Sequence, residues 1–503
     1  MRLTPTLFAA TLTLLLGWTG QLSPVQAQGQ HFDANTLPDL GDASSTVFTP
    51  SDEARIGRDI VRQIRASGAM LEDPDLEEYL QGLGQHLAAH SSRPGERFEF
   101  FIIRSNAINA FALPGGYIGI NAGLILAADN ESELAGVVAH EIAHVTQRHI
   151  ARQIDGMRGS NLATLGAMLG AILIAANTGE SDVAMATAIS AQALQLQRQI
   201  NYTRAHEYEA DRVGIRMMTE AGFDPEGMAT FFEKLQRRSQ YSPGQGVPEY
   251  LRTHPLTTAR ITEARNRAQE ARESGHESSR RFYLMRERIN AMYATAGNRE
   301  AIPLSPARSP ADLSFIADLE TWRKAVHAQS RGRHDLAAQL FASLREKSSD
   351  IISYYIGEAE SLMAQDQTDK GLALYESALA LFPNNRPLLE SYGLSLAQAG
   401  KGDQAMEQLL KLSRGQDVRP RYHRHMARAA SESANEAESH YHMAGYYQSQ
   451  GDIFSAITQM RLALQYPQTD IRQHARFTER MTQLNSQWEQ LPRRVQQAQR
   501  PTQ

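Results

Sequence analysis

Residues 140–144 have the sequence His140-Glu141-Ile142-Ala143-His144, an H-E-x-x-H motif with apolar residues on both sides. Apolar side chains recur at helical spacing over residues 132–154, which predicts a single helix there. Two histidines four residues apart lie on one helix face, where they can hold one zinc ion. Glu141 would then lie beside the open metal position, where a carboxylate can accept a proton from the attacking water. The plain alternative is a solvated helix face with two histidines, and the apolar neighbours argue against it.

The third ligand that such a site needs is not supplied by the same helix. A histidine six residues after His144 would complete a longer zinc motif, but that position is Ile150. His149 is displaced by one residue, and we expect it to be a structural or helix-surface residue. A carboxylate from a second helix is the alternative, and Glu207, the first residue of the sequence EYEAD, supplies one. His206 is a further candidate for the same role.

The EYEAD sequence places two carboxylates on one face of a helix predicted over residues 191–221. Glu207 and Asp211 are four residues apart, so their side chains point the same way. Glu207 is the expected third ligand. Asp211 is expected to accept the other imidazole N–H of His140, as carboxylates commonly do behind a metal-bound histidine. Glu209 points elsewhere, and we expect it to be a surface charge.

Three spaced motifs resemble those of the HtpX-type gluzincin metallopeptidases: HEIAH, EYEAD and the dipeptide His254-Pro255. The segment 109–116, NAFALPGG, is similar to the strand and turn ahead of the zinc helix in that family. The resemblance covers residues 50–270. It implies an α+β, mostly helical metalloprotease domain over residues 49–273, with one zinc ion per chain and endopeptidase activity.

His254 is the residue whose role the sequence leaves open. The proline that follows it disfavours helical backbone at His254, so we expect the imidazole to lie on a loop. A loop histidine near zinc could stabilise the oxyanion as a donor aimed at developing charge. It could instead occupy the fourth zinc position and keep the enzyme latent, or it could simply cap a helix.

Short strands are predicted ahead of the zinc helix. Phe98, Phe100 and Ile102 alternate with other residues, and the runs 110–113 and 117–120 flank a Pro-Gly-Gly turn, which predicts a hairpin. The strand near residues 109–113 could accept an extended peptide at a sheet edge, a sequence-tolerant way to hold a substrate.

The N-terminus predicts secretion. A basic start, an apolar run over residues 7–18 and small residues ending at Ala27 have the form of a signal peptide, so we expect cleavage near Ala27. Residues 28–48 are expected to be an irregular lead-in. The apolar segment 161–176 is expected to be a buried helix, and contact with a membrane or a substrate is the alternative.

The C-terminal part of the chain is repetitive. Ala337, Gly371 and Ala405 follow one another at intervals of 34 residues. Large apolar residues follow four positions after each of them, namely Phe341, Tyr375 and Leu409. This period resembles the tetratricopeptide repeat, so we expect an all-α repeat solenoid over residues 313–486. Residues 274–312 are expected to be a linker, and residues 487–503 a flexible tail.

Composition narrows the functional classes. The 503 residues include no cysteine, which excludes thiolate catalysis and disulfides, and the net charge of −5 gives no sign of nucleic-acid binding. The signal peptide, protease domain and repeats together resemble periplasmic members of this family. That resemblance implies unfolded or misassembled outer-membrane proteins as substrates, and the barrel-assembly machinery as a partner of the repeats. The alternative is a chaperone or adaptor that acts through its repeats and has a latent protease domain.

Overall fold

The structure is a computed structural model that describes most of the chain after residue 48. The described ranges are 49–156, 204–241, 248–271, 278–294, 310–413, 420–467, 470–491 and 493–499, all within one compact unit. The expected signal peptide, the lead-in and the apolar segment 161–176 lie outside these ranges. Over the part of the chain that is described, no helix is long and apolar enough to cross a membrane.

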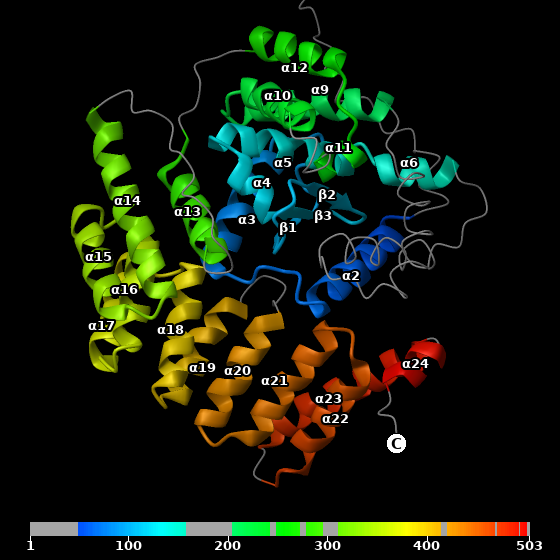
Figure 1. Ribbon diagram of the computed structural model, residues 1–503. Helices are drawn as coiled ribbons and strands as arrows, with labels where there is room; N and C mark the ends of the chain where they lie inside the picture. The colour runs from blue at the N-terminus through cyan, green and yellow to red at the C-terminus, as the bar shows by residue number, and fades with distance from the viewer. Residues whose placement is uncertain are drawn as a thin grey trace, which may run out of the picture. The chain divides into compact units, whose positions relative to one another are not determined.

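A three-stranded sheet lies ahead of the zinc-motif helix (Figure 1). Its strands are β1 (Glu99–Ile103), β2 (Ala110–Leu113) and β3 (Tyr117–Asn121), in the order β1-β3-β2. The central strand β3 pairs parallel with β1 and antiparallel with β2, so the predicted strand and the predicted hairpin are confirmed. Gly115 and Gly116 form the turn with φ of 78° and 82°, a region of backbone conformation that glycine adopts without steric cost.

Alternating side chains on these strands pack into two separate layers. Helix α2 (Pro50–Ala66) covers the face that carries Phe101, Ile103, Phe111 and Leu113. Helices α3 (Pro74–Ala88) and α5 (Glu131–Thr146) cover the face that carries Phe100, Ile102, Ala112 and Ile118. Asp73 caps α3 by accepting from the backbone N–H groups of Asp75 and Leu76, and Pro74 is the first residue of the helix.

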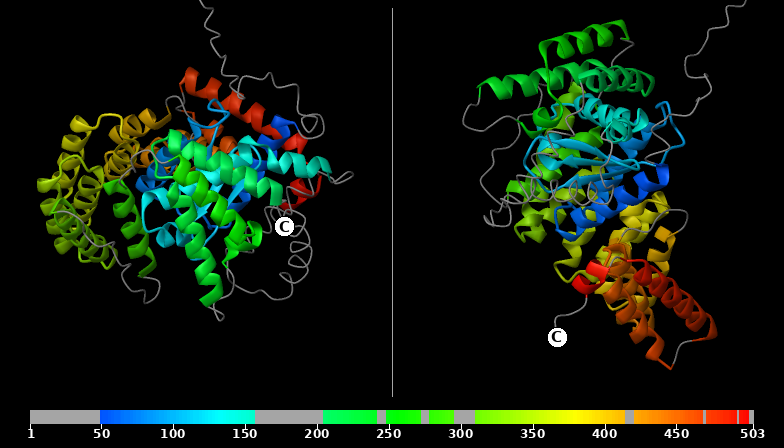
Figure 2. Two further views of the ribbon diagram at one scale, coloured as in Figure 1. Left: turned by 90° about the horizontal axis from the view of Figure 1, so that it is seen from above. Right: turned by 90° about the vertical axis from the view of Figure 1, so that its right-hand side faces the viewer.

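Helix α5 lies between this sheet and a further layer of helices (Figure 2). The remaining elements of the first part of the chain are α4 (Ala122–Ala127), α6 (His149–Gly156), α9 (Arg204–Glu220), α10 (Glu226–Tyr241), α11 (Glu249–Thr253), α12 (Thr258–Glu270) and α13 (Arg280–Ala294). Gly214 lets α9 approach α5 closely, because a Cβ there would lie 3.3 Å from the backbone nitrogen of His140.

The single helix predicted over residues 132–154 is interrupted. Helix α5 ends at Thr146 and α6 begins at His149. Between them Arg148 has a φ of 52°, a left-handed conformation that an uninterrupted helix excludes. The Arg148 guanidinium lies 2.7 Å from Glu53 on α2, which anchors the turn. The prediction failed because apolar residues keep their helical spacing across the turn, although the helical backbone is interrupted there.

The linker predicted over residues 274–312 is also only partly irregular. Its residues 280–294 form α13, and Phe282, Met285 and Ile289 on this helix are fully buried. They belong to the same hydrophobic core as Trp322 and Phe341 of the first repeat helices. The prediction from Ser, Arg and Pro enrichment missed this helix, and the core continues across the expected boundary.

The second part of the chain is a run of antiparallel helices in sequence order. They are α14 (Pro310–Ser330), α15 (His334–Lys347), α16 (Ile352–Met363), α17 (Thr368–Leu381), α18 (Arg386–Gln398), α19 (Gly402–Leu410), the 3-10 turn η2 (Lys411–Ser413), α20 (Pro420–Glu432), α21 (Glu436–Ser449), α22 (Ile453–Gln465), α23 (Ile471–Gln490) and α24 (Arg493–Gln499). The aligned positions Ala337, Gly371 and Ala405 are buried where neighbouring helices meet, as the repeat predicts. The fold is thus α+β and mostly helical, followed by an all-α repeat solenoid.

The predicted flexible tail is largely helical. Helices α23 and α24 extend to residue 499, and Gln499 accepts hydrogen bonds from the backbone N–H groups of Ile453 and Phe454. It also donates to the carbonyl of Gly451. These contacts hold α24 against the start of α22, and the polar composition of the tail gave no sign of them.

Candidate metal centre

Helix α5 presents the two motif histidines inside the protein. Asn130 caps the helix by accepting from the backbone N–H of Glu133 at 2.9 Å, and every residue of the helix is buried. His140 and His144 lie one turn apart on one face, and their Nε2 atoms are 3.0 Å apart. Neutral imidazole is the form that binds metal, and burial lowers the pKa of His144 well below its usual range.

Helix α9 brings Glu207 to the same point, across from α5. The Glu207 carboxylate has one oxygen 3.6 Å from His140 Nε2 and the other 3.5 Å from His144 Nε2. Glu207 is 1% exposed, so its charge is buried among the groups that it contacts. The two helices therefore place both histidines and one carboxylate together.

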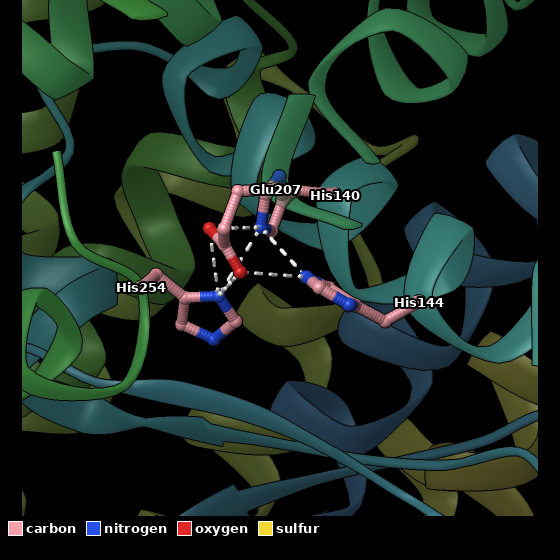
Figure 3. Close-up of side chains that lie close together, drawn as sticks. All are labelled: His140, His144, Glu207 and His254. Carbon is pink, nitrogen blue, oxygen red and sulfur yellow. Dashed lines mark hydrogen bonds and ion pairs between the residues drawn. The ribbon is translucent and has the colours of Figure 1, made fainter. Parts of the chain in front are cut away.

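His254 completes the group from the end of α11 (Figure 3). Its backbone is extended, with φ of −121° and ψ of 82°, as expected before a proline. Its Nδ1 lies 3.1 Å from a Glu207 oxygen and 3.3 Å from His140 Nε2. His254 is the C-terminal cap residue of α11, yet its ring enters the site. Four potential ligand atoms, one each from His140, His144, Glu207 and His254, thus lie within 4.8 Å of one another.

The four groups fit a metal ion in number and chemistry. A tetrahedral zinc site with ligand distances of about 2.0–2.2 Å keeps its ligand atoms roughly 3.4 Å apart. The hydrogen bonds and ion pairs among the four side chains run from 3.0 to 3.6 Å. Three imidazole nitrogens and one carboxylate oxygen are a donor set that suits zinc. Within the described ranges, no other set of three or more His, Asp or Glu side chains converges in this way.

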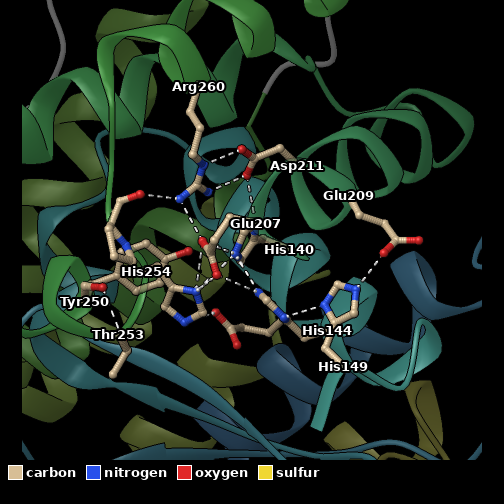
Figure 4. Close-up of polar contacts among 12 residues, drawn as sticks. His140, His144, His149, Glu207, Glu209, Asp211, Tyr250, Thr253, His254 and Arg260 are labelled. Atoms are coloured by element: carbon tan, nitrogen blue, oxygen red, sulfur yellow. Dashed lines mark hydrogen bonds and ion pairs between the residues drawn. The ribbon is translucent and has the colours of Figure 1, made fainter. Parts of the chain in front are cut away.

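Asp211 and Arg260 lie behind this group (Figure 4). Asp211 Oδ1 is 3.0 Å from His140 Nδ1, the contact that the spacing of the EYEAD sequence predicted. Burial alone would raise the pKa of Asp211, but hydrogen bonds from His140 and Arg260 outweigh it and lower the pKa. Arg260 also lies 2.7 Å from Glu207 Oε2. Arg260 was not expected from the sequence. Two buried carboxylates, Glu207 and Asp211, require a nearby cation, and an arginine five residues after Pro255 could have indicated it.

Glu141 lies on the other side of the four-residue group. It is fully buried, and burial raises the pKa of its carboxyl above the usual range. Neither carboxylate oxygen has a hydrogen-bond partner among the described residues, and one lies 3.5 Å from His254 Nε2. A buried carboxylate with a raised pKa is a stronger base than an exposed one, which suits the role of a general base.

The expectations about two neighbouring residues are met in part. His149 is a structural residue and not a helix-surface one: it is fully buried, and its Nδ1 lies 2.8 Å from Nδ1 of His144. Glu209 is not one of the four grouped residues, but it is only partly exposed and contacts His149 Nε2 at 3.1 Å and Arg152 at 2.7 Å. The unexpected turn at Arg148 redirects His149 toward α5 and α9. His206, the alternative ligand, stacks on His149 and is not one of the four grouped residues.

Comparisons with known proteins agree with this arrangement. Residues 74–268 match peptidase family M48, and residues 362–429 match a tetratricopeptide repeat. The beta-barrel assembly-enhancing protease of Escherichia coli (strain K12) is 40% identical over 289 residues, which cover 57% of this chain and 58% of that protein.

Other relatives extend the match. The beta-barrel assembly-enhancing protease of Yersinia pestis is 32% identical over 391 residues, which cover 78% of this chain and 79% of that protein. The mitochondrial metalloendopeptidase OMA1 of Arabidopsis thaliana is 28% identical over 224 residues, covering 44% of this chain and 42% of that protein. The chain spans little more than half the length of the Escherichia coli relative but most of the Yersinia pestis one. This chain therefore belongs to peptidase family M48, with tetratricopeptide repeats after its peptidase domain.

Proposed function

We propose that this protein is a zinc-dependent endopeptidase of the bacterial periplasm. The observation that carries the proposal is the convergence of His140, His144, Glu207 and His254 beside the free carboxylate of Glu141. These four side chains would hold one zinc ion per chain. A zinc ion bound there would polarise the scissile carbonyl and lower the pKa of the attacking water.

Glu141 would perform the proton transfers. Its carboxylate accepts a proton from the attacking water and then donates it to the nitrogen of the leaving amine. Burial raises the pKa of this carboxyl, which makes it a stronger base toward the attacking water than an exposed glutamate. Asp211 would keep His140 in the tautomer that leaves Nε2 free, because it accepts from Nδ1.

The edge of the sheet offers a way to hold the substrate. The backbone carbonyl of Asn109 accepts from the backbone N–H of Asn121. In an antiparallel pair the backbone groups of every second residue therefore point from β2 toward β3. The intervening residues Ala110 and Ala112 direct their backbone groups to the outer edge of β2, the end strand of the sheet. Since α5 also packs against β2, an extended peptide added to this edge would run beside the zinc-motif helix.

The biological role follows from the relatives and the repeats. We propose that this chain acts in the assembly of outer-membrane barrel proteins, and the name of its relatives, beta-barrel assembly-enhancing protease, supports a role in barrel assembly. Unfolded or misassembled barrel proteins would be the substrates, and the repeats would bind the client or the barrel-assembly machinery. The expected signal peptide supports a periplasmic location. Edge-strand binding depends mainly on backbone, so selectivity is assigned to the repeats.

Two isosteric substitutions test the enzyme. Glu141→Gln should keep about one zinc per chain and lower the rate of casein cleavage roughly 10²–10⁴-fold, the range for a removed general base. Glu207→Gln should lose most of the metal together with the activity. A chelator should abolish wild-type cleavage, and zinc should restore it. Full activity in Glu141→Gln would overturn the assignment of the proton transfers to Glu141. A wild-type chain without chelator-sensitive cleavage would overturn the proposal and favour a chaperone or adaptor.

A further inference from the structure

His144 needs a specific tautomer if its Nε2 is to bind a metal. A neutral imidazole carries one N–H, so a free lone pair on Nε2 places the proton on Nδ1. That N–H lies inside the protein and needs an acceptor. The atom 2.8 Å away is Nδ1 of His149, so His149 must accept there.

The same pairing of donors with acceptors fixes the tautomer of His149. Because its Nδ1 accepts, its own proton is on Nε2. His149 Nε2 lies 3.1 Å from Glu209 Oε2, and the Arg152 guanidinium lies 2.7 Å from the same oxygen. The N–H groups of His144 and His149 therefore each meet an acceptor, in the series His144, His149, Glu209 (Figure 4). Arg152 balances the charge of Glu209 at the end of this series.

The backbone is shaped to make this contact. In an uninterrupted helix a residue five positions after His144 would be rotated by roughly 140° from it. The left-handed turn at Arg148 instead starts α6 at His149 and brings the two rings together, with centroids 4.8 Å apart. His206 stacks on the other side of His149, with centroids 4.5 Å apart and planes 14° apart. The position of the His149 ring is thus fixed by backbone, stacking and hydrogen bonds together.

The two motif histidines therefore have different supports. His140 meets the carboxylate of Asp211 directly at 3.0 Å. On its Nδ1 side, His144 is linked to the carboxylate of Glu209 through the imidazole of His149. We propose that His149 and Glu209 are positioning residues that fix the ring orientation and the tautomer of His144 for metal binding. This inference rests on the proposed zinc site. It predicts that changing either residue weakens metal binding without removing a ligand.

Metal affinity is the decisive readout, since a merely structural role would leave it unchanged. The zinc dissociation constant is measured by competition with a chromophoric chelator on the full chain. His149→Phe keeps a buried aromatic ring but offers no acceptor, and it should weaken zinc binding 10–100-fold, the usual effect of losing such a partner. Glu209→Gln keeps an acceptor oxygen but loses its charge, and its effect should be smaller, about 3–10-fold. His206→Phe keeps the stacking surface and should bind zinc within about twofold of wild type.

A second measurement separates positioning from folding. Cobalt substituted for zinc reports the geometry of the site through its visible absorption, and the spectrum of His149→Phe should differ from that of wild type. The thermal midpoint of each metal-free variant shows whether the fold is intact. Wild-type zinc affinity and a wild-type cobalt spectrum in folded His149→Phe would overturn the inference. If His149→Phe does not fold, unchanged affinity in Glu209→Gln overturns it instead. A wild-type chain without zinc would instead refute the proposed function itself.

Discussion

Arg260 donates two hydrogen bonds to Asp211, from Nε to Oδ2 and from Nη2 to Oδ1, each 2.7 Å long. The remaining terminal nitrogen of the guanidinium lies 2.7 Å from Glu207 Oε2. One buried cation thus holds both carboxylates that α9 directs toward the metal centre. Without Arg260, the buried negative charges of Glu207 and Asp211 would lie one helical turn apart without the guanidinium that pairs with both.

Arg260→Met should therefore unfold more easily and lose metal. Removing one partner of a buried ion pair costs about 3–5 kcal/mol, because the other charge stays buried. Arg260→Lys should be intermediate, since an ammonium cannot form both planar hydrogen bonds. Urea unfolding and zinc content test this. Arg267→Met on the same helix is the control: its ion pair with Glu263 is exposed, so the change should be within about 1 kcal/mol. Equal effects in the two variants would contradict the prediction.

His254→Ala should raise the rate of cleavage of an unfolded substrate several-fold at saturating zinc. The structure groups His254 with the three expected ligands, and a catalytic zinc site needs an open position. Removing the imidazole would open that position to water and substrate. Initial rates on casein measure the change, and His254→Ala combined with Glu141→Gln should be inactive. A fall in rate would instead indicate oxyanion stabilisation, and an unchanged rate would leave only the role of a helix cap.

The ion pairs between the repeats and α3 should make stability depend on pH. Arg421 contacts both Glu390 on α18 and Glu77 on α3. Burial alone would raise the pKa of Glu390, but hydrogen bonds from His425 and Arg421 and the charge of Arg421 outweigh it and lower the pKa to about 2. A carboxylate with a lowered pKa stabilises the folded state above its unfolded pKa, and the contribution is lost as the pH falls toward 2.

We therefore compare wild type with Glu390→Gln between pH 2 and pH 7. Wild type should be more stable above about pH 4.5, by at most roughly 3 kcal/mol for a shift of this size. The difference in thermal midpoint should shrink steadily below that pH and vanish near pH 2. Glu407→Gln, at an exposed position on α19, should show no such trend. A difference that is constant with pH would show that the Glu390 carboxylate does not contribute through its charge.

Selectivity of the repeats is best tested by removing the last of them. Residues 436–503 contribute a hydrophobic core of their own, with Phe477 and Leu484 at its centre. A chain that ends at residue 435 should keep its zinc and cleave casein at about the wild-type rate. It should lose action on misassembled barrel proteins and co-purification with the barrel-assembly machinery. Full action on those clients would contradict the assignment of selectivity to this part of the repeats.

A shorter chain that ends at residue 312 is a poor test of the same idea. Trp322 and Phe341 lie beyond that point, yet both are fully buried in the core that the peptidase domain also uses. Deleting large buried aromatic residues typically costs about 3–5 kcal/mol each. We expect this chain to unfold at a lower temperature than one that ends at residue 435, measured by circular dichroism.

Local periodicity in the sequence was enough to predict the parts of the site that lie on a single helix. Residues four apart on a helix share a face whatever surrounds them, so His140 with His144, and Glu207 with Asp211, were paired correctly. The Pro-Gly-Gly turn fixed the hairpin, because its glycines adopt positive φ. The 34-residue period predicted which small residues are buried in the repeats, since each repeat buries the same face against its neighbour.

Which separate elements meet could not be predicted from local patterns, because such contacts depend on backbone direction over long stretches of chain. Because Arg148 is left-handed, His149 is a buried contact of His144, so the structural alternative holds and the helix-surface one does not. Arg260 became part of the metal centre because α12 packs against α9. The continuous core across α13 likewise depends on packing between helices, which neither composition nor spacing encodes locally.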